Sequence, residues 1–377
     1  MKLTLPLLKS AITTYVDRNK VSVADLNVTK NNTVGLLDKI GKIFWIPNEY
    51  VDKLALFDGE DLSYGKSIEE WAADLILPED YDASGSGALT PHRSTYRPVS
   101  FSFTLGRKKI PQTIDYNDVE RAVNNEAQFV EIIAAKYKVI NDSETLMRYQ
   151  IKKEGLAVLI ARAVAQMDPA NATAWTNAAH STVNALFKAD ANATDTYILV
   201  KPYKLNDASN FADAVAKGFL VKNDLVTEIA KPVDTSTGEA FVEQIKKDVE
   251  VAEDTSEGHS LNGNTLGTVA DKLVLIKLQG IAPVIDTKVM SGAFHEDKVS
   301  LPARSVTVNG FGSDATGCYS ILMDERGMRL HNTYRAVREN TNGDGDFLNL
   351  FAHSEWTLHI SRNSFVKVYK PAAVVED

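Results

Sequence analysis

YRPVSFSFTLGRKK, residues 96–109, carries the pattern from which the architecture of this chain can be inferred. Apolar and hydroxyl side chains alternate along it, with Val99, Phe101, Phe103 and Leu105 set against Ser100, Ser102 and Thr104. Because successive side chains of a β-strand point to opposite faces, this alternation predicts a strand with one apolar face. That face requires cover from another part of the molecule or from a neighbour.

The predicted strand belongs to a long excursion of the chain, residues 58–110. The segment SIEEWAADL, residues 67–75, is compatible with a helix or an extended chain, and DASGSGALTP, residues 82–91, marks a long polar bend. We interpret the excursion as two β arms with a Gly/Ser tip. It holds too little apolar material for a core, and an isolated hairpin is marginal in water. We therefore expect a partner to cover it.

The excursion begins with DGEDLSYGKSIEEW, residues 58–71, in which Gly65-Lys66-Ser67 matches the end of a phosphate-binding P-loop. The required spacing is four residues between the glycines, but five separate Gly59 from Gly65. The intervening acidic residues would also repel a phosphate. We therefore interpret Lys66 as a surface lysine and predict that the chain binds no nucleotide.

Two helices are expected after the excursion, over residues 115–140 and 142–167. Asp142 is the predicted N-cap of the second helix and Pro169 its stop. At 1.5 Å per residue this helix would be roughly 36 Å long. Gly155 inside it costs about 1 kcal/mol relative to alanine, which suggests that another backbone approaches closely there.

Residues 170–330 show alternating patterns that predict a compact α/β domain. We expect strands at 196–200, 272–278, 305–311 and 318–324, and an amphipathic helix at 238–253. The polar segment 254–268 is expected to be a surface loop. The runs LNLFAHSEWTLHISR and NSFVKVYK then predict strands of a sheet that also takes segments from far upstream. Nearer the N-terminus, VGLLDKIGKIFWI, residues 34–46, favours a strand through its ending.

Composition narrows the classes of protein that the chain can represent. It has 377 residues with 41 basic and 50 acidic side chains, a net charge of −9, which argues against a broad phosphate-binding face. The one cysteine, Cys318, cannot form an internal disulfide and lies in an apolar run that predicts a buried strand. Neither a signal peptide nor a membrane-spanning segment is predicted.

Motifs that carry chemistry are not found. NTNGDGDFLNLF, residues 340–351, resembles the start of a calcium-binding loop, but Phe351 stands where a bidentate glutamate is required, so we predict a tight turn between strands. The histidines show no metal-binding spacing: His92, His180, His259, His295, His331, His353 and His359. The sequence therefore predicts an assembly protein rather than an enzyme, with no catalytic, cofactor-binding or metal-binding residues.

Several segments together carry a family resemblance. In chain order they are LLDKIGKIFWI, YGKSIEEWAADLILPEDYDA, TGEAFVEQIKKDV, IAPVIDTKVMSGAF, SVTVNGF and EWTLHISRNSF. Their collinear order over residues 35–370 resembles the major capsid proteins of tailed phages with the HK97-like fold, most closely the phi29-type podovirus capsid proteins.

The resemblance implies an α+β fold of known organisation. It implies an N-terminal arm and first P-domain strand at 1–57, an extended E-loop hairpin at 58–110, a P-domain with a long spine helix at 111–169, an α/β A-domain at 170–330, and return strands of the P-domain at 331–377.

The same resemblance implies a function and partners. The chain would self-assemble through hexamers and pentamers into the icosahedral shell of a tailed bacteriophage, enclosing double-stranded DNA that lies adjacent without specific binding. A separate scaffolding protein and a portal are expected, and contact with a membrane is not. The expected location is the virion capsid, assembled in the host cytoplasm.

The alternative is a soluble α/β enzyme or ligand-binding protein with a site in the domain at residues 170–330. Regular shells or tubes seen by negative-stain microscopy would favour the capsid protein.

Overall fold

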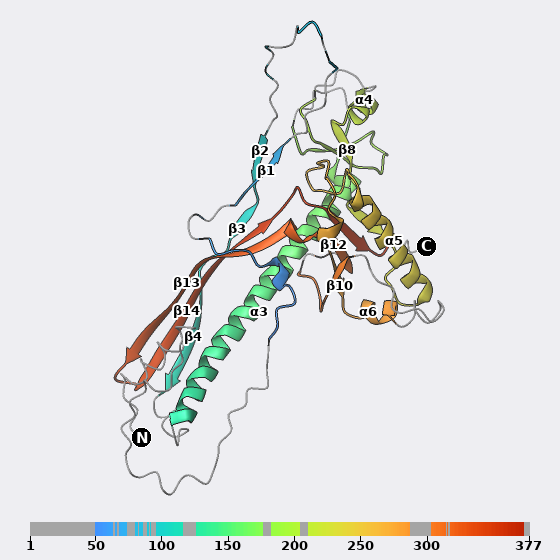
Figure 1. Cartoon of the computed structure of the whole chain (residues 1–377). Coiled ribbons are helices and arrows are strands. Elements are labelled where there is room, and N and C mark those ends of the chain that lie inside the picture. The colour runs from blue at the N-terminus through green and yellow to red at the C-terminus, as the bar shows by residue number, and fades with distance from the viewer. Residues whose placement is uncertain are drawn as a thin grey trace, which may run out of the picture.

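The computed structural model describes residues 50–62, 65, 68–73, 80–81, 83–85, 89, 91, 96–115, 126–175, 182–203, 210–286, 303–313, 315 and 317–372. Figure 1 shows an elongated molecule in which one long helix runs beside a long hairpin and ends among two smaller groups of strands. The predicted strand at residues 34–46 and Lys66 lie outside the described residues.

A single helix, α3 (Glu126–Met167), forms the spine of the molecule. Its 42 residues span roughly 63 Å at 1.5 Å per residue. The prediction of two helices separated near Asp142 was wrong. The expected break contains residues that favour helix ends, but two hydroxyls there bond back into the helix: Ser143 Oγ to the carbonyl of Val139 at 2.7 Å, and Thr145 Oγ1 to that of Asn141 at 2.9 Å.

A long sheet lies beside the N-terminal half of α3. Its centre is the hairpin of β13 (Met328–Asn342) and β14 (Phe347–Ile360), and β14 also pairs with β3 (Ser102–Thr104) and β4 (Lys108–Asp115). All these pairings are antiparallel. The sheet therefore joins strands about 250 residues apart in the chain, as predicted.

A second, five-stranded sheet holds the order β11-β10-β12-β15-β9. Its strands are β9 (Val226–Glu228), β10 (Leu273–Leu278), β11 (Arg304–Val308), β12 (Ser320–Asp324) and β15 (Val366–Lys370). β10 confirms the strand predicted at 272–278, and β11 and β12 confirm those predicted at 305–311 and 318–324. β15 pairs with β12 and β9, whereas β14 belongs to the long sheet. The expectation that the two C-terminal runs form strands of one sheet was therefore wrong, because the turn after β14 carries the chain into the second sheet.

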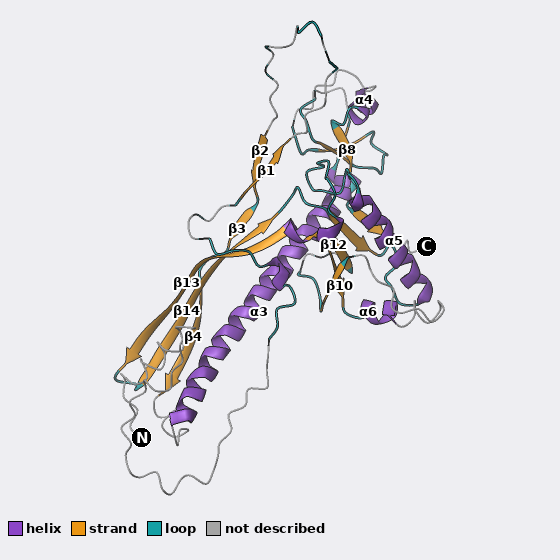
Figure 2. Ribbon diagram, viewed as in Figure 1, coloured by secondary structure: helices purple, strands orange, loops and turns teal. Residues whose placement is uncertain are grey.

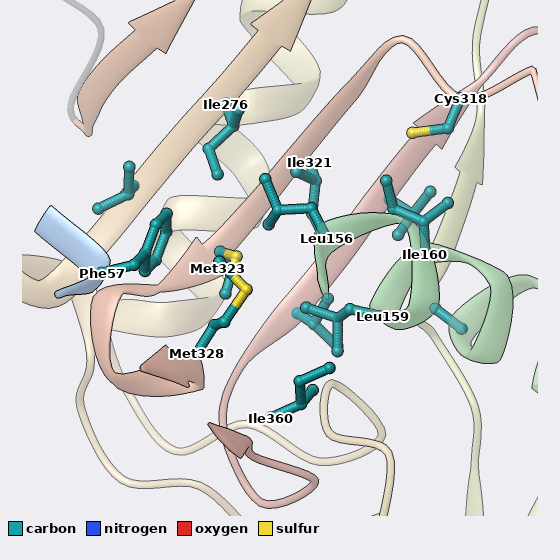
Figure 3. Close-up of a cluster of buried hydrophobic side chains, with 14 of the residues drawn as sticks. Phe57, Leu156, Leu159, Ile160, Ile276, Cys318, Ile321, Met323, Met328 and Ile360 are labelled. Carbon is teal, nitrogen blue, oxygen red and sulfur yellow. The ribbon is translucent and has the colours of Figure 1, made fainter. Parts of the chain in front are cut away.

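Two helices cover the two faces of the five-stranded sheet. The C-terminal half of α3 packs on one face, where Leu156 and Ile160 meet Ile276 and Ile321 (Figure 3). Helix α5 (Thr235–Glu253) packs its apolar side, led by Phe241, on the other face. Alternate residues of β10 serve the two clusters, as expected of a strand buried on both sides. The short helix α6 (Ile281–Val284) follows β10.

The predicted amphipathic helix at 238–253 is confirmed, and it begins three residues earlier because of its cap. Asp234 is the N-cap: its carboxylate accepts from the amide of Thr237 at 2.9 Å, while the Thr237 hydroxyl accepts from the amide of Asp234 at 3.1 Å. This reciprocal pair satisfies amide groups that the first turn of a helix leaves unpaired.

A small four-stranded sheet lies near the C-terminal end of α3. It contains β5 (Thr173–Ala174), β6 (Leu186–Lys188), β7 (Tyr197–Leu199) and β8 (Leu220–Lys222), with helix α4 (Asn210–Ala216) packed on it. β7 confirms the strand predicted at 196–200. Trp175 is central to its core and meets Phe187 and Phe211 edge-on. Four single-turn 3-10 helices complete the described elements: Ala55–Phe57, Pro169–Asn171, Ala270–Lys272 and Glu325–Gly327.

The segment 254–268 differs from its prediction as a surface loop, because residues 258–263 are buried. Its polar side chains bond to one another and to the turn after β14. The side-chain amides of Asn262 and Asn264 both donate to Asn363 Oδ1, at 2.7 and 2.6 Å. Polar composition is compatible with burial when the polar groups find partners in this way.

Cys318 lies buried beside the main core, as predicted (Figure 3). Its thiol donates to the carbonyl of Ser320 at 3.1 Å, and burial raises its pKa to about 12. The thiol is therefore neutral at ordinary pH and unsuited to nucleophilic chemistry.

Gly155 fits a close approach, but from side chains of the same chain. A Cβ at this position would lie 2.8 Å from Met328 Sδ and 2.9 Å from Leu358 Cδ2, on the hairpin β13–β14. The expected neighbouring backbone is not what restricts this site. The glycine lets the spine helix pack directly onto the long sheet.

We predict that Gly155→Leu lowers the free energy of unfolding by about 1–3 kcal/mol, because overpacking at the contact between α3 and the hairpin outweighs the gain in helix propensity. Urea denaturation of the unassembled protein measures the change. Gly267→Leu is the matched control, since nothing lies within 4 Å of a Cβ there, and its effect should stay within about 0.5 kcal/mol. Equal stability of the Gly155→Leu variant and the parent would contradict the packing described here.

Candidate assembly interface

A two-stranded arm projects from the rest of the molecule (Figures 1 and 2). β1 (Glu69–Ala73) and β2 (Tyr96–Ser100) pair antiparallel, with Trp71 opposite Pro98, and within the described residues they hydrogen-bond to no other strand. Large apolar side chains along the arm are exposed: 63% for Trp71, 93% for Tyr81 and 99% for Leu89. The prediction of a β excursion is confirmed over these strands.

The root of the arm receives more cover from its own chain than expected. Leu105 packs against the main core, and Phe101 lies under the guanidinium of Arg362, whose Cζ is 4.0 Å from the ring centroid. Phe103 remains 42% exposed. The pairing of β3 with β14 explains the difference, because it places this part of the strand on the molecule's own sheet. The part of the predicted excursion that its own chain leaves uncovered is therefore the distal arm, β1 and β2.

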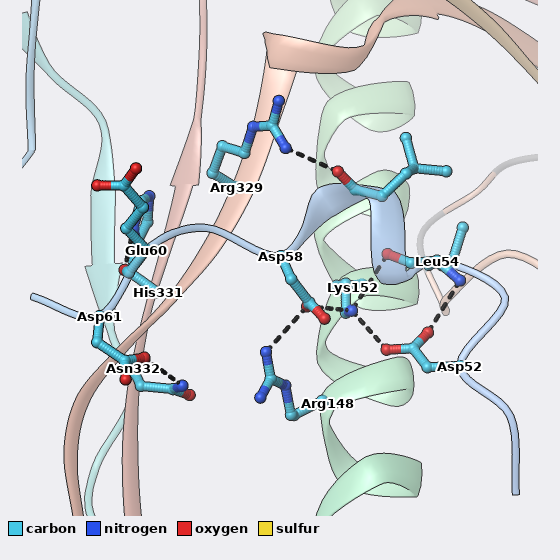
Figure 4. A network of polar contacts seen from close by, with 11 residues as sticks. Asp52, Leu54, Asp58, Glu60, Asp61, Arg148, Lys152, Arg329, His331 and Asn332 are labelled. Atoms are coloured by element: carbon cyan, nitrogen blue, oxygen red, sulfur yellow. Dashed lines mark hydrogen bonds and ion pairs between the residues drawn. The ribbon is translucent and has the colours of Figure 1, made fainter.

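A buried lysine fixes the segment that leads into the arm (Figure 4). Lys152 on α3 is fully buried, and its Nζ donates to Asp52 Oδ2 and Asp58 Oδ1, both at 2.5 Å, and to the carbonyl of Leu54 at 3.1 Å. Arg148, one turn earlier, also pairs with Asp58 at 3.0 Å. A buried ammonium needs such partners, so residues 52–58 are held against the spine helix.

The same segment then runs along β13 towards the arm. The amides of Gly59 and Leu62 donate to the carbonyls of Leu330 and Asn332, at 2.9 and 2.8 Å. A Cβ at Gly59 would collide with the ring of His331, so glycine is required by packing at this point. This accounts for the first glycine of the apparent P-loop. After Gly65 the chain enters the strand β1, where a P-loop would open a helix.

The calcium-like sequence at 340–351 forms the turn between β13 and β14, as predicted. Asn342 Oδ1 accepts from the amides of Asp344 and Gly345, at 3.0 and 3.1 Å. This is an Asx-type turn in which the side-chain oxygen serves the backbone. Within the described residues, no group of three or more His, Cys, Asp or Glu side chains could hold a metal ion.

The described histidines have separate surroundings. His331, His353 and His359 belong to β13 and β14, and His259 lies buried on the ring of Phe365. His259 Nε2 is 3.2 Å from the carboxylate of Asp224, which also pairs with the buried Lys367 at 2.6 Å. Contact with His259 and the charge of Lys367 hold the pKa of Asp224 well below its usual range. This cluster holds the segment just before β9 against β15, which is a structural role. His92, His180 and His295 lie outside the described residues.

No helix among the described residues is long and apolar enough to cross a membrane. The functional features that remain are extended surfaces: a projecting arm, a long rigid spine and a long hairpin. This arrangement of arm, spine helix and hairpin matches the subunits of the HK97-like fold.

Comparisons with known proteins identify the family. The model of the Phi29-like phage major capsid protein matches residues 11–366, and the chain belongs to this family. It is therefore a structural protein of the virion capsid that assembles with copies of itself, and the alternative of an enzyme is excluded. No curated protein matches the chain.

One solved structure supports the fold, and two others are reported for comparison. A chain from the structure of the head fiber and inner core protein of native bacteriophage P68 has a TM-score of 0.52 at 10% identity, over 89% of this chain and 88% of that one. The capsid of Staphylococcus phage Andhra gives 0.49 at 12% identity, over 96% and 99%. The capsid of the cyanophage P-SCSP1u gives 0.49 at 10% identity, over 99% of both chains.

We predict that Lys152→Met lowers the free energy of unfolding by about 3 kcal/mol, because it leaves the carboxylates of Asp52 and Asp58 beside an apolar side chain. Urea denaturation measures the change. Lys153→Met is the matched control: its exposed Nζ donates to Asn309 Oδ1 at 3.0 Å and lies 5.6 Å from the ring centroid of Tyr149, so its effect should remain below about 1 kcal/mol. Similar losses in both variants would show that the buried network is not what holds the segment.

Proposed function

We propose that this capsid protein closes an icosahedral shell around double-stranded DNA, and that each subunit contributes its arm as a lap joint over a neighbour. The observation that carries the proposal is the distal arm itself. β1 and β2 pair only with each other within the described residues, and they expose Trp71. A two-stranded sheet with exposed apolar side chains gains stability when another surface covers it.

The parts of the subunit have distinct roles in this proposal. The N-terminal arm at residues 1–57 precedes the E-loop at 58–110, which makes the lap joint. The P-domain at 111–169 contains α3 as its spine, and the return strands at 331–377 complete its sheet. The A-domain at 170–330 supplies contacts around the axes of hexamers and pentamers. β15 in addition ties the C-terminal part of the chain to the A-domain sheet.

The closed shell is stable because contacts are multiplied. Each joint is modest, but a subunit in a shell makes several at once, and breaking one leaves the others in place. The net charge of −9 suits the wall of a shell around DNA, because a negatively charged wall repels packaged DNA rather than binding it. We further propose a separate scaffolding protein, a portal, and assembly in the host cytoplasm, with no contact to membranes.

We predict that replacing residues 72–98 with a short Gly-Ser linker abolishes shell formation but leaves a folded, soluble subunit. The main core is built from α3, the residues around 54–57 and strands outside the deletion, so its contacts survive. Circular dichroism should show cooperative melting with some loss of strand signal. Negative-stain microscopy should show shells for the full chain under the same conditions and none for the variant.

A milder variant controls for the change in chain length. Replacing only residues 83–89 with Gly-Ser keeps both arm strands, and this protein should still assemble. Closed shells from the variant that lacks 72–98 would contradict the proposed lap joint. Unfolding of that variant would show that the distal arm belongs to the subunit's own core.

A further inference from the structure

Two arginines at the root of the arm have no ion-pair partner in the part of the chain that the structure describes. Arg162 lies on α3 and Arg362 lies in the turn between β14 and β15. Arg162 Nη1 and Arg362 Nε are shielded from solvent and form no hydrogen bond. Buried charged donors without acceptors are unfavourable, so this arrangement calls for an acceptor supplied from elsewhere.

Aromatic rings hold both guanidinium groups in place. Arg362 Cζ is 4.0 Å from the ring centroid of Phe101, and Arg162 Cζ is 5.7 Å from that of Phe103. Cation–π contact of this kind engages the face of the guanidinium and leaves its N–H edge available to an acceptor. Burial, together with the positive charge of Arg162, lowers the pKa of Arg362. An anion bound beside the pair would relieve both effects.

The two arginines line an open cavity of about 230 Å³ between α3, the small sheet and the buried loop. The described residues around it include three side-chain amides, from Gln166, Asn171 and Asn184, and no acidic residue. The amides of Gln166 and Asn171 already donate within the chain, to the carbonyls of Leu261 and Ala165 at 2.9 and 3.2 Å. The donors left for an anion are therefore the guanidinium nitrogens Arg162 Nη1 and Arg362 Nε. A carboxylate fits this site, because arginine binds carboxylates through two parallel N–H donors.

Phe103, which contacts Arg162, also lines a mostly apolar groove whose lining includes Lys153 and Glu154. The groove, about 600 Å³, runs between α3 and the sheet and includes Leu105, Val158, Leu358 and Ile360. Phe103 therefore links the positive pair to a mostly apolar groove at the root of the arm.

The distal arm has the complementary sequence. EEWAADLILPEDYD, residues 69–82, contains six acidic residues and no lysine or arginine. Its apolar run, residues 75–77, lies between Asp74 and the acidic residues that begin at Glu79. Of the described acidic residues in this segment, Glu69 and Asp80 are exposed, whereas Glu70 is half-buried and accepts from Ser361 Oγ of its own chain at 2.6 Å. Glu70 is therefore not one of the carboxylates offered to a neighbour. Opposite charge and matching apolar content favour this segment as the occupant.

We propose that Arg162 and Arg362 form a carboxylate-binding site for residues 69–82 of a second copy of this chain. This inference rests on the proposed function, since it requires arms that reach neighbours, and it names the surface that receives them. Because the contact is electrostatic and partly exposed, it also predicts that assembly weakens as the salt concentration rises.

The test compares two double variants for assembly without nucleic acid. Arg162→Gln with Arg362→Gln removes both charges, and Arg162→Lys with Arg362→Lys retains them. We expect the threshold protein concentration for shells, measured by light scattering and microscopy, to rise about tenfold or more for the Gln pair, since charge-assisted hydrogen bonds are lost. The Lys pair should stay nearer the parent, and both should melt within a few degrees of it.

Charge reversal distinguishes a docking contact from a purely structural role. Glu79→Lys with Asp80→Lys and Asp82→Lys should impair assembly alone, and combining these changes with Arg162→Glu and Arg362→Glu should restore it in part. Rescue of this kind requires that the two groups meet. Loss of assembly without rescue, accompanied by a lowered melting temperature, would assign the arginines a structural role and overturn the proposal.

Contact between copies is tested by mixing tagged subunits. A subunit that lacks residues 72–98 keeps the arginines, and the Gln pair keeps its arm, so the two should form a complex if the arm binds in trans. Absence of that complex would overturn the proposal.

Three further outcomes separate this inference from the proposed function. Assembly of the Gln pair at the parent's threshold would overturn the inference and leave the capsid function intact. An assembly defect of the Gln pair that occurs only when DNA is present would show that the site binds phosphate. That result would also overturn the inference. Failure of the parent chain to form any shell would contradict the proposed function, and the inference would fall with it.

Discussion

The distal arm cannot bury its own apolar side chains, and this constraint governs the rest of the molecule. β1 and β2 form a sheet of two strands, and Trp71 is exposed on it. Such a sheet gains order from a partner. In the proposed lap joint, the arm has to project from a fixed base so that a neighbour can bind it.

The rigid base depends on the spine helix. Lys152 binds the incoming segment through Asp52 and Asp58, while Gly155, one turn later, lets the hairpin β13–β14 pack directly on the helix. On the outgoing side, β3 and β4 are hydrogen-bonded to β14. Both ends of the excursion are thus fixed to one body by buried charge, close packing and strand pairing.

Local patterns in the sequence predicted the elements whose signals are local. The alternation at Phe103 and the spacing of Phe241 gave a strand and a helix that the structure contains. The break near Asp142 was misjudged because hydroxyl groups can bond back within a helix. The loop 254–268 was misjudged because its polar side chains bond each other. In both cases the amino-acid composition of the segment does not reveal the interaction that decides its structure.

The assembly surface was predictable only in outline. The exposed excursion follows from its sequence, and the family resemblance supplied its role. The anchoring of the arm could not be predicted from the sequence. Lys152 contacts carboxylates about 100 residues away, and its neighbours in the sequence do not indicate this role. Arg162 and Arg362 are likewise 200 residues apart in the chain and meet only in the fold. Such sites depend on tertiary contacts and need the structure.

The most direct test of this account is hydrogen–deuterium exchange measured on the unassembled subunit and on assembled shells. The account predicts that amides of β1 and β2 exchange rapidly in the subunit and become protected in the shell, while those of β13 and β14 are protected in both. Protection of β1 and β2 already complete in the unassembled subunit would contradict the claim that the arm depends on a neighbour.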